Sequence, residues 1–479
     1  MWFQPRPPTT EYAPSPANGQ IIAGLLIVGL GLLAFKLLVV DRTATLFRRA
    51  GQPAVTQPTA IQGEALRMDG FSLSRETVPA GGTFDMDMAW AAVAAPQVDY
   101  QTNVWLVGPN GLTWSDKGTE RPRVYEDAPP TRQWAAGEWG WDSREVRVLS
   151  GTPPGEYDLV VTLFDKATLE PLTLTDPATG AVIGPTAVVG QVTVGETNEG
   201  EIEPQFSLTA DSSALGLHLL GYNQDRNVAA PGEGVLLTLF WERLENSSPA
   251  SDFTLVLQDE AGTAVQSWML PVTRADYPPA SWPEGRPVRG QYVVSLPPDL
   301  ASGTYTFVIE GSPILGDLQV NAPERLTELP PLSPVLDVDF NLPDGSIAAT
   351  LAGLNGTNLD DVALCTDERT AGETCRVPLV WQAVAELPTS YHIFLHLVDA
   401  DGQLLAQTDG IPANWERPTT GWLPGEVILD DHLLTLPNPL PEGPLTLRVG
   451  LYDPDTGTRL AVGEADYLTI PCPEDASEM

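Results

Sequence analysis

The sequence predicts an all-β protein: three tandem immunoglobulin- or fibronectin-like β-sandwich domains preceded by one N-terminal transmembrane helix. Three observations support this prediction: many Pro and Gly residues, a repeated pattern of Gly and Trp, and one long apolar run. The 479 residues include 46 Pro and 43 Gly. A helical protein would not tolerate so many, because Pro breaks helix interiors and both residues favour turns between strands.

The Gly and Trp pattern occurs three times in the same order. In each copy a Trp follows the first Gly by nine residues, and the next Gly follows that Trp by twenty-one. The copies are Gly81, Trp90, Gly111, Trp134, Gly137 and Gly155; Gly232, Trp241, Gly262, Trp282, Gly285 and Gly303; and Gly372, Trp381, Gly402, Trp422, Gly425 and Gly443. Such a register indicates three copies of one domain.

Residues 21–40 form an apolar run with one charge, Lys36, placed where its side chain can reach the membrane interface. Twenty such residues span the hydrocarbon core of a bilayer, so we predict a transmembrane helix. A cleaved signal peptide is the alternative, although no clear small-residue cleavage site follows. Residues 1–20 are a Pro-rich tail predicted to be disordered, and residues 41–63 are predicted to form a polar stalk.

The orientation of this predicted helix is contested by the sequence. Arg42, Arg48 and Arg49 follow it and only Arg6 precedes it, which by the positive-inside rule favours a cytoplasmic C-terminal side. Serial Pro-rich β-domains with a candidate disulfide are typical of the opposite side. Because long domains can translocate despite flanking charge, we predict a single-pass protein of the cell membrane with extracytoplasmic β-domains.

The repeat places the β-sandwiches at residues 64–195, 205–321 and 333–470, followed by an acidic tail at 471–479. The linkers ETNEGEIEP and APERLTELPPLSP are short and rich in Pro and acidic residues, so we expect them to be semi-extended and to keep the domains apart. Within each copy, alternating apolar residues predict a strand that ends on the first Trp. A hairpin strand closed by the middle Gly follows, and two further strands come after the second Trp.

Four strings carry a resemblance to a known family. They are LLGYN, YHIFLHLVDADGQLLAQ, PTTGWLPGEVILDDHLLTLP and PEGPLTLRVGLYDPDTGTRL. They resemble the C-terminal extracytoplasmic β-sandwich region of bacterial dolichyl-phosphate-mannose mannosyltransferase-like (family 39 type) membrane glycosyltransferases. The resemblance covers most of the chain after residue 64 and is best in the third domain. That family's catalytic part is a bundle of many membrane helices, and this chain has one predicted helix, so the resemblance implies no glycosyltransferase activity.

Charge and cysteine content exclude several functions. With 63 acidic and 25 basic residues, the net charge of −38 repels phosphate backbones, so nucleic acid is not an expected partner. Cys365 and Cys375 lie ten residues apart in CTDERTAGETC, and Cys472 lies alone in the acidic tail. A disulfide between Cys365 and Cys375 and two free thiols both remain open. No paired Cys or His motif indicates zinc.

No catalytic motif is present, so we predict a protein that is not an enzyme and needs no cofactor. His392 and His396 have a helical metal-binding spacing, but YHIFLHLVD alternates as a strand, on which residues four apart lie about 13 Å from each other. The acidic turns DADG and DPDTG resemble fragments of calcium loops. Because GPNG and DEAG replace DADG in the other copies, hairpin geometry explains the shared Gly and no metal is expected.

The second Trp of each copy is the recurring candidate for recognition. Trp134, Trp282 and Trp422 lie in Pro- and Gly-flanked segments, where an indole can either stack on a ligand or cover one end of the core. Recurrence in three copies favours packing. Trp139 and Trp141 occur in the first copy alone and form the first place to test for ligand contact. The predicted function is membrane-anchored binding, spacing or scaffolding, with a carbohydrate-recognising accessory to a separate glycosyltransferase as the alternative; cell-envelope polysaccharide or a membrane protein is the expected partner.

Overall fold

The computed structural model describes residues 31–32, 55–116, 130–212, 215–311, 314–356, 370–439 and 443–472. The predicted Pro-rich tail, most of the predicted transmembrane helix at residues 21–40, and Cys365 lie outside these ranges. Within the described residues, no helix is both long and apolar enough to span a membrane. The chain forms two compact units, the first made of residues up to 149 and 154–199, the second of residues 150–153 and 200–479.

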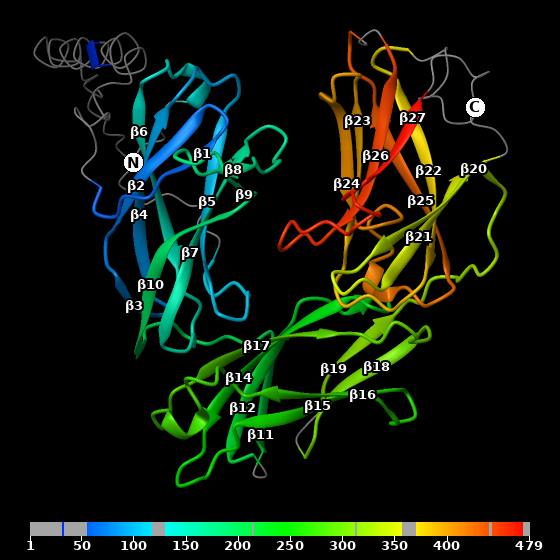
Figure 1. Ribbon diagram of the computed structural model, residues 1–479. Coiled ribbons are helices and arrows are strands. Elements are labelled where there is room, and N and C mark those ends of the chain that lie inside the picture. Colours follow the sequence, from blue (N-terminus) through cyan, green and yellow to red (C-terminus); the bar gives the residue numbers. More distant parts are fainter. Residues whose placement is uncertain are drawn as a thin grey trace, which may run out of the picture. The chain divides into compact units, whose positions relative to one another are not determined.

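The first unit is a sandwich of two sheets (Figure 1). One sheet has the order β6-β4-β2-β1-β8-β9 and the other has the order β3-β10-β7-β5. The bounds are β1 Ile61–Gly63, β2 Leu66–Leu73, β3 Thr77–Ala80, β4 Thr83–Ala92, β5 Tyr100–Val107, β6 Trp139–Arg147, β7 Gly155–Asp165, β8 Leu174–Thr175, β9 Val182–Gly184 and β10 Ala187–Asn198. Alternate residues of β4, including Phe84, Met86, Met88 and Trp90, are buried between the sheets, as period-two patterning requires.

The second unit contains two further pairs of sheets, each around its own core. The first pair has orders β11-β12-β14-β17 and β13-β19-β18-β15-β16. Its bounds are β11 Phe206–Ser212, β12 Leu217–Gln224, β13 Val228–Ala229, β14 Gly234–Arg243, β15 Asp252–Gln258, β16 Ala264–Pro271, β17 Val288–Ser295, β18 Gly303–Ile309 and β19 Ile314–Val320.

The last pair of sheets has orders β20-β21-β22-β25 and β24-β23-β26-β27. Its bounds are β20 Leu332–Asn341, β21 Ile347–Asn355, β22 Thr374–Ala383, β23 His392–Val398, β24 Leu404–Gly410, β25 Val427–Thr435, β26 Leu445–Tyr452 and β27 Leu468–Cys472. The all-β prediction is confirmed for the described residues from 55 onwards, which contain strands, turns and short 3-10 helices, whereas residues 31–32 are helical.

The repeated landmarks occupy equivalent places in the three sandwiches. The first Trp lies near the end of β4, β14 and β22, and each of these strands pairs with β6, β17 or β25. The middle glycines Gly111, Gly262 and Gly402 close hairpin turns with φ of 74°, 78° and 80°, a conformation that glycine adopts without strain. The Gly register therefore reflects turns that need positive φ.

A short 3-10 helix precedes the second Trp in all three copies. These helices are η2 Thr131–Gln133, η3 Pro279–Ser281 and η6 Thr419–Gly421. In each, the Trp that follows donates its backbone N–H to the carbonyl of the first helical residue. The sequence predicts loops at these three segments instead of helices. A single 3-10 turn is too short to show a periodic pattern of apolar residues.

The first sandwich begins earlier than residue 64. Gln57 forms a bridge with Phe71, and β1 pairs with β2, so residues 57–63 belong to the sheet rather than to a stalk. The additional residues of the first copy, near 173–190, form β8 and β9 at the edge of the same sheet. The predicted start of the first sandwich at residue 64 is too late, because a three-residue strand shows too little alternation to be distinguished from a linker.

The linker between the second and third copies is not extended away from the domains. The N–H of Val427 donates to the carbonyl of Leu326, and the Arg325 guanidinium donates to the Gly421 carbonyl at 3.1 Å and also bonds the Pro298 carbonyl. The expectation of separated domains is therefore wrong within the second unit. The reason is that Arg325, a basic residue in an otherwise acidic linker, bonds to acceptor groups of both the second and the third sandwich.

Candidate functional site

The three recurrent second tryptophans are buried. Trp134, Trp282 and Trp422 expose 6%, 1% and 0% of their surface. The indole N–H of Trp282 donates to the carbonyl of Tyr277, and that of Trp422 to the carbonyl of Arg417, at 3.1 and 3.2 Å. An indole enclosed in this way cannot stack on a ligand, so we withdraw these three residues as binding candidates and assign them to core packing.

Trp139 and Trp141 have a different environment. They are two residues apart on β6, so both side chains point to the same face, away from the core-facing Arg144 and Val146. Their partners across the ladder are Ala91 and Ala89 on β4. Both indoles are partly exposed, and together they place two aromatic rings on one face of the sheet.

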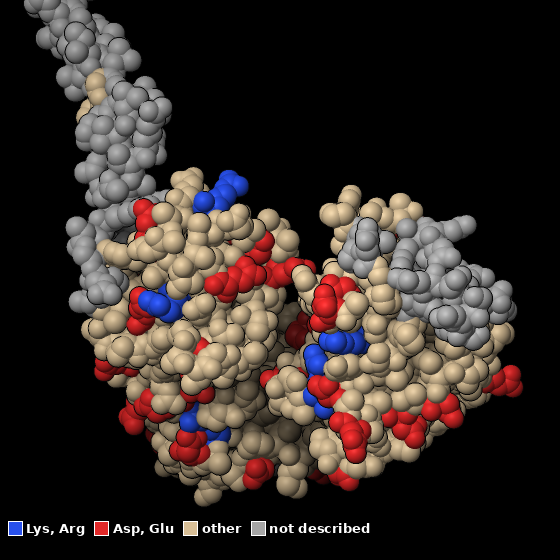
Figure 2. All heavy atoms as spheres, turned by 45° about the horizontal axis from the view of Figure 1, so that its top comes forward, with Lys and Arg blue, Asp and Glu red and all other residues tan. Residues whose placement is uncertain are grey.

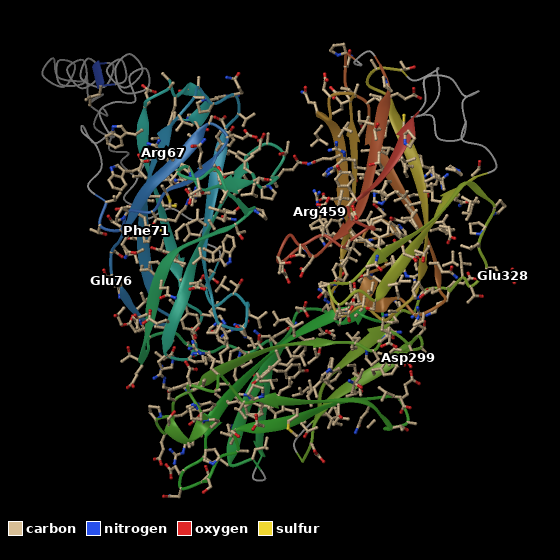
Figure 3. The ribbon with its side chains drawn as sticks, viewed as in Figure 1. Arg67, Phe71, Glu76, Asp299, Glu328 and Arg459 are labelled. Atoms are coloured by element: carbon tan, nitrogen blue, oxygen red, sulfur yellow. The ribbon has the colours of Figure 1, made fainter. Side chains whose placement is uncertain are left out.

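A pocket of about 440 Å³ lies beside the Trp139 ring. Its lining residues are Arg67, Asp69, Ala89, Trp90, Ala91, Ala92, Val93, Gly137 and Trp139. The guanidinium of Arg67 contacts the carboxylate of Asp69 at 2.6 Å, and this hydrogen bond raises the pKa of Arg67. Arg67 lies on β2 in the first unit (Figure 3). Aromatic faces beside a few fixed polar groups are typical of small-ligand sites.

The sheet under the aromatic pair is held by a buried polar cluster. Arg144, which is 1% exposed, donates to the Thr102 hydroxyl at 3.1 Å and to the Asp142 carboxylate at 3.2 Å. The Thr102 hydroxyl also donates to Asp142. Thr102 belongs to β5 in the opposite sheet, so these bonds join the two sheets behind Trp141. These buried bonds fix the strand that presents the indoles.

Cys375 is buried in the third core, and its thiol is free among the described cysteines. Burial raises the pKa of Cys375, and the nearby Glu373 adds to the effect. Because Cys365 lies outside the described residues, the bridge between the two stays a prediction.

Neither candidate metal position has the geometry of a metal site. His392 and His396 lie on strand β23, as their alternation predicts. One oxygen of Asp399 accepts the backbone N–H groups of Asp401 and Gln403, and Asp259 makes the same bonds in its turn. Among the residues that the structure describes, no three His, Cys, Asp or Glu side chains gather to hold an ion.

On the face drawn in Figure 2, carboxylates are spread across both units, and Lys and Arg form smaller groups among them. The net charge of −38 disfavours an anionic ligand. Neutral or cationic ligands suit such a surface better.

One exposed aromatic residue was missed by the sequence analysis. Trp415 is 60% exposed, the largest value for any Trp in the described chain, and it lines a second pocket in the third sandwich. Trp415 precedes Trp422 by seven residues and does not belong to the repeated Gly and Trp pattern. Comparison of the copies could have revealed it, because Ala275 stands at the corresponding position, seven residues before Trp282.

No protein-family model and no curated protein matches the chain. Among solved structures, it is similar to a membrane-anchored protein from Corynebacterium diphtheriae, with 12% identity over 85% of this chain and 92% of that one and a TM-score of 0.14. It is also similar to the D0-D1 domain of intimin, with 13% identity over 53% of this chain and 96% of that one and a TM-score of 0.14. These similarities are too weak to indicate function, which must be inferred from the chain's own residues.

Proposed function

We propose that this chain is a membrane-anchored, non-enzymatic cell-surface protein whose tandem sandwiches, of immunoglobulin or fibronectin type, serve in binding, spacing or scaffolding. The apolar run at residues 21–40 is the anchor, and the β-domains are extracytoplasmic. The proposal is supported by three serial β-sandwich cores joined by short linkers. Tethered domains of this kind present binding surfaces outside the membrane.

The observation that favours binding is the paired indole surface on β6. Trp139 and Trp141 share one face of the sheet, Ala89 and Ala91 leave room above it, and the Arg67–Asp69 pair supplies donors and acceptors at its side. Exposed aromatic side chains cost free energy in water. A partner that covers these two indoles would remove them from water and gain that free energy on binding.

A second candidate function is recognition of carbohydrate beside a separately encoded membrane glycosyltransferase. Sugar rings have apolar C–H faces that stack on indoles and hydroxyl groups that bond to carboxylate and guanidinium groups. The β6 surface offers both kinds of contact. The resemblance of the sequence to the accessory region of membrane glycosyltransferases favours the same ligand class.

The test is binding of a soluble fragment, residues 55–472, to purified cell-envelope polysaccharide. We expect the fragment to co-sediment with the polysaccharide, and the double variant Trp139→Ala/Trp141→Ala to bind at least about tenfold more weakly, since a lost stacking surface is worth on the order of 1.4 kcal/mol. The measurement is a sedimentation isotherm at constant salt.

Two controls separate binding from folding. Met269→Ala removes a side chain that is 81% exposed and distant in sequence from β6, so its isotherm should match the unaltered fragment. The circular dichroism melt of the double variant should also be unchanged. Equal binding by the double variant and the Met269→Ala control would contradict a recognition role for β6.

A further inference from the structure

Trp415 lies in a pocket of about 460 Å³ in the third sandwich. The pocket is lined by Arg376, Thr408, Asp409, Gly410, Ile411, Asn414, Trp415, Asp431, His432 and Leu433. These residues come from β22, β24, β25 and the segment that follows β24. One large aromatic face thus stands beside several short polar side chains, in a space of the size that holds small organic ligands.

The indole is exposed but held in place. Its ring packs against the backbone of Gly410, where an added Cβ would lie 2.8 Å from the Trp415 Cε2. His392 meets the ring edge-on, with centroids 5.3 Å apart. Tyr452 contacts the same imidazole at 5.5 Å, and its hydroxyl donates to the Asp409 carboxylate at 2.7 Å. Trp415 therefore presents one face while the rest of the ring is supported.

The segment that carries Trp415 has an unusual backbone. Ala413, Asn414 and Trp415 have φ of 53°, 56° and 73°, three consecutive non-glycine residues in the left-handed region. L-residues other than Asn and Asp disfavour this region. The backbone bonds from Trp415 N–H to the Ile411 carbonyl at 3.0 Å, and from Arg417 N–H to the Pro412 carbonyl at 3.0 Å, close the turn.

A buried carboxylate anchors this turn to the core. Asp430, which is 1% exposed, accepts the N–H of Ala413 at 2.7 Å with one oxygen. Its other oxygen accepts the indole N–H of Trp381 at 3.3 Å and bonds the His432 imidazole at 2.7 Å. The strained turn is thus tied to the first Trp of the repeat, and the position of Trp415 is set by the core.

The second sandwich lacks each of these parts. Asp430 lies two residues after the strand residue that pairs with Trp381. In the second sandwich, the residue two positions after the ladder partner of Trp241 is Gly290. There the Trp241 indole N–H donates to the Tyr292 hydroxyl instead. Since both sandwiches fold, the Asp430 anchor and the Trp415 turn are not requirements of the fold.

The polar groups around the indole identify a ligand class. Arg376 and Asp431 form an ion pair at 2.7 Å on the pocket wall, both more than half exposed, and Asp409 and Asn414 add further donors and acceptors. Two carboxylates against one guanidinium disfavour an anion. One flat aromatic face with amide, carboxylate and guanidinium groups beside it suits a ring with apolar C–H groups and peripheral hydroxyls.

We propose that the Trp415 pocket binds a neutral pyranose unit of a polysaccharide, with the sugar ring stacked on the indole and its hydroxyls bonded to Asp409, Asn414 and the Arg376–Asp431 pair. This site is separate from the β6 surface. It rests on the proposed function only in taking carbohydrate as the ligand class.

The test uses the full-length chain in phosphatidylcholine nanodiscs, titrated calorimetrically with maltose, cellobiose and laminaribiose in turn. We expect at least one of these neutral disaccharides to bind. Trp415→Ala should weaken that binding by at least about tenfold. Trp415→Phe should restore part of it. Asn414→Gly, which keeps the positive φ and removes the amide, should also weaken it.

Controls make the result decisive. Trp139→Ala and Met269→Ala should bind the disaccharide as the unaltered chain does. The proposal is overturned if no neutral disaccharide binds at millimolar concentration, if Trp415→Ala binds normally, or if digalacturonate binds as tightly as the neutral sugars. Loss of binding in Trp139→Ala alone would overturn the Trp415 site while supporting the β6 surface, so the two proposals fail separately.

Discussion

His392 and His396 show how single residues of the third sandwich couple stability to pH. Burial lowers the pKa of both; Asp409 and Asp455 partly oppose this at His392, and the charge of Arg459 lowers the pKa of His396 further. The unfolded chain therefore binds protons at a higher pH than the folded chain does. As pH falls through about 6.5, protonation favours the unfolded state, so the free energy of unfolding decreases.

We expect His396→Gln to reduce this dependence. Between pH 7.5 and pH 5.5 the variant should lose less thermal stability than the unaltered chain, because one proton-binding group of the unfolded state is absent. Differential scanning calorimetry at both pH values measures the difference, and His218→Gln, a change in the second sandwich, is the comparison. Identical losses in His396→Gln and the unaltered protein would show that His396 titrates alike in both states.

At the scale of the element, a glycine at a β-bulge recurs in all three sandwiches. Gly70, Gly221 and Gly353 each stand where the ladder to the next strand shifts register. A Cβ at these positions would lie 2.6, 2.5 and 2.4 Å from a backbone oxygen of the preceding segment. The bulge thus needs glycine because the backbone of a neighbouring segment lies against it.

Gly221→Ala should destabilise the second sandwich by about 1–3 kcal/mol, since either the Phe206 carbonyl or the strand must move. Gly262→Ala is the matched control. Gly262 also has positive φ, but no atom lies within 4 Å of its added Cβ, so its cost should be near 1 kcal/mol, from the backbone alone. Guanidinium unfolding curves give both values. A loss at Gly221 no larger than that at Gly262 would contradict the steric explanation.

The bulge glycines are also an example of a feature that the sequence alone did not predict. Gly70 and Gly221 each precede the first Gly of the repeat in their own copy by eleven residues, whereas Gly353 precedes that of the third copy by nineteen. Because this interval varies, the repeated Gly and Trp pattern did not include these glycines. The strands that contain Trp90, Trp241 and Trp381 were predictable because each is a short, largely apolar run in which buried residues alternate over part of its length. The turn at Trp415 was not, since a left-handed turn held by a carboxylate fifteen residues later leaves no periodic signal.

The candidate site on β6 was predictable in part. The residues Trp139 and Trp141 stood out because the other copies lack them. Their shared outward face was not predicted, because the residues around Gly140 show too little alternation to indicate a strand, whereas pairing with β4 makes the segment one. Tertiary contacts decided the structure there, as Trp134 packs where a Cβ at position 140 would otherwise stand.

At the scale of the whole molecule, Arg325 joins two sandwiches within the second unit. Its guanidinium pairs with Glu426, which is 2% exposed and also pairs with Arg417, and it bonds the carbonyls of Gly421 and Pro298. Pro298 belongs to the second copy and the other three residues to the third. Loss of either guanidinium leaves this buried carboxylate with weaker charge compensation, and a poorly compensated buried charge is costly.

Arg325→Ala should therefore destabilise the third sandwich by about 3 kcal/mol and expose the linker at residues 322–331 to protease, because Glu426 keeps only Arg417 as a partner. Arg376→Ala is the matched control: its pair with Asp431 at 2.7 Å is solvent-exposed, so the loss should stay below about 1 kcal/mol. Limited proteolysis with thermal melts distinguishes the two variants. If Arg325→Ala is cut no faster than Arg376→Ala, the linker is not held by this ion pair, and the bonds from Thr420 to the Gly232 carbonyl and from Val427 to the Leu326 carbonyl suffice to hold it.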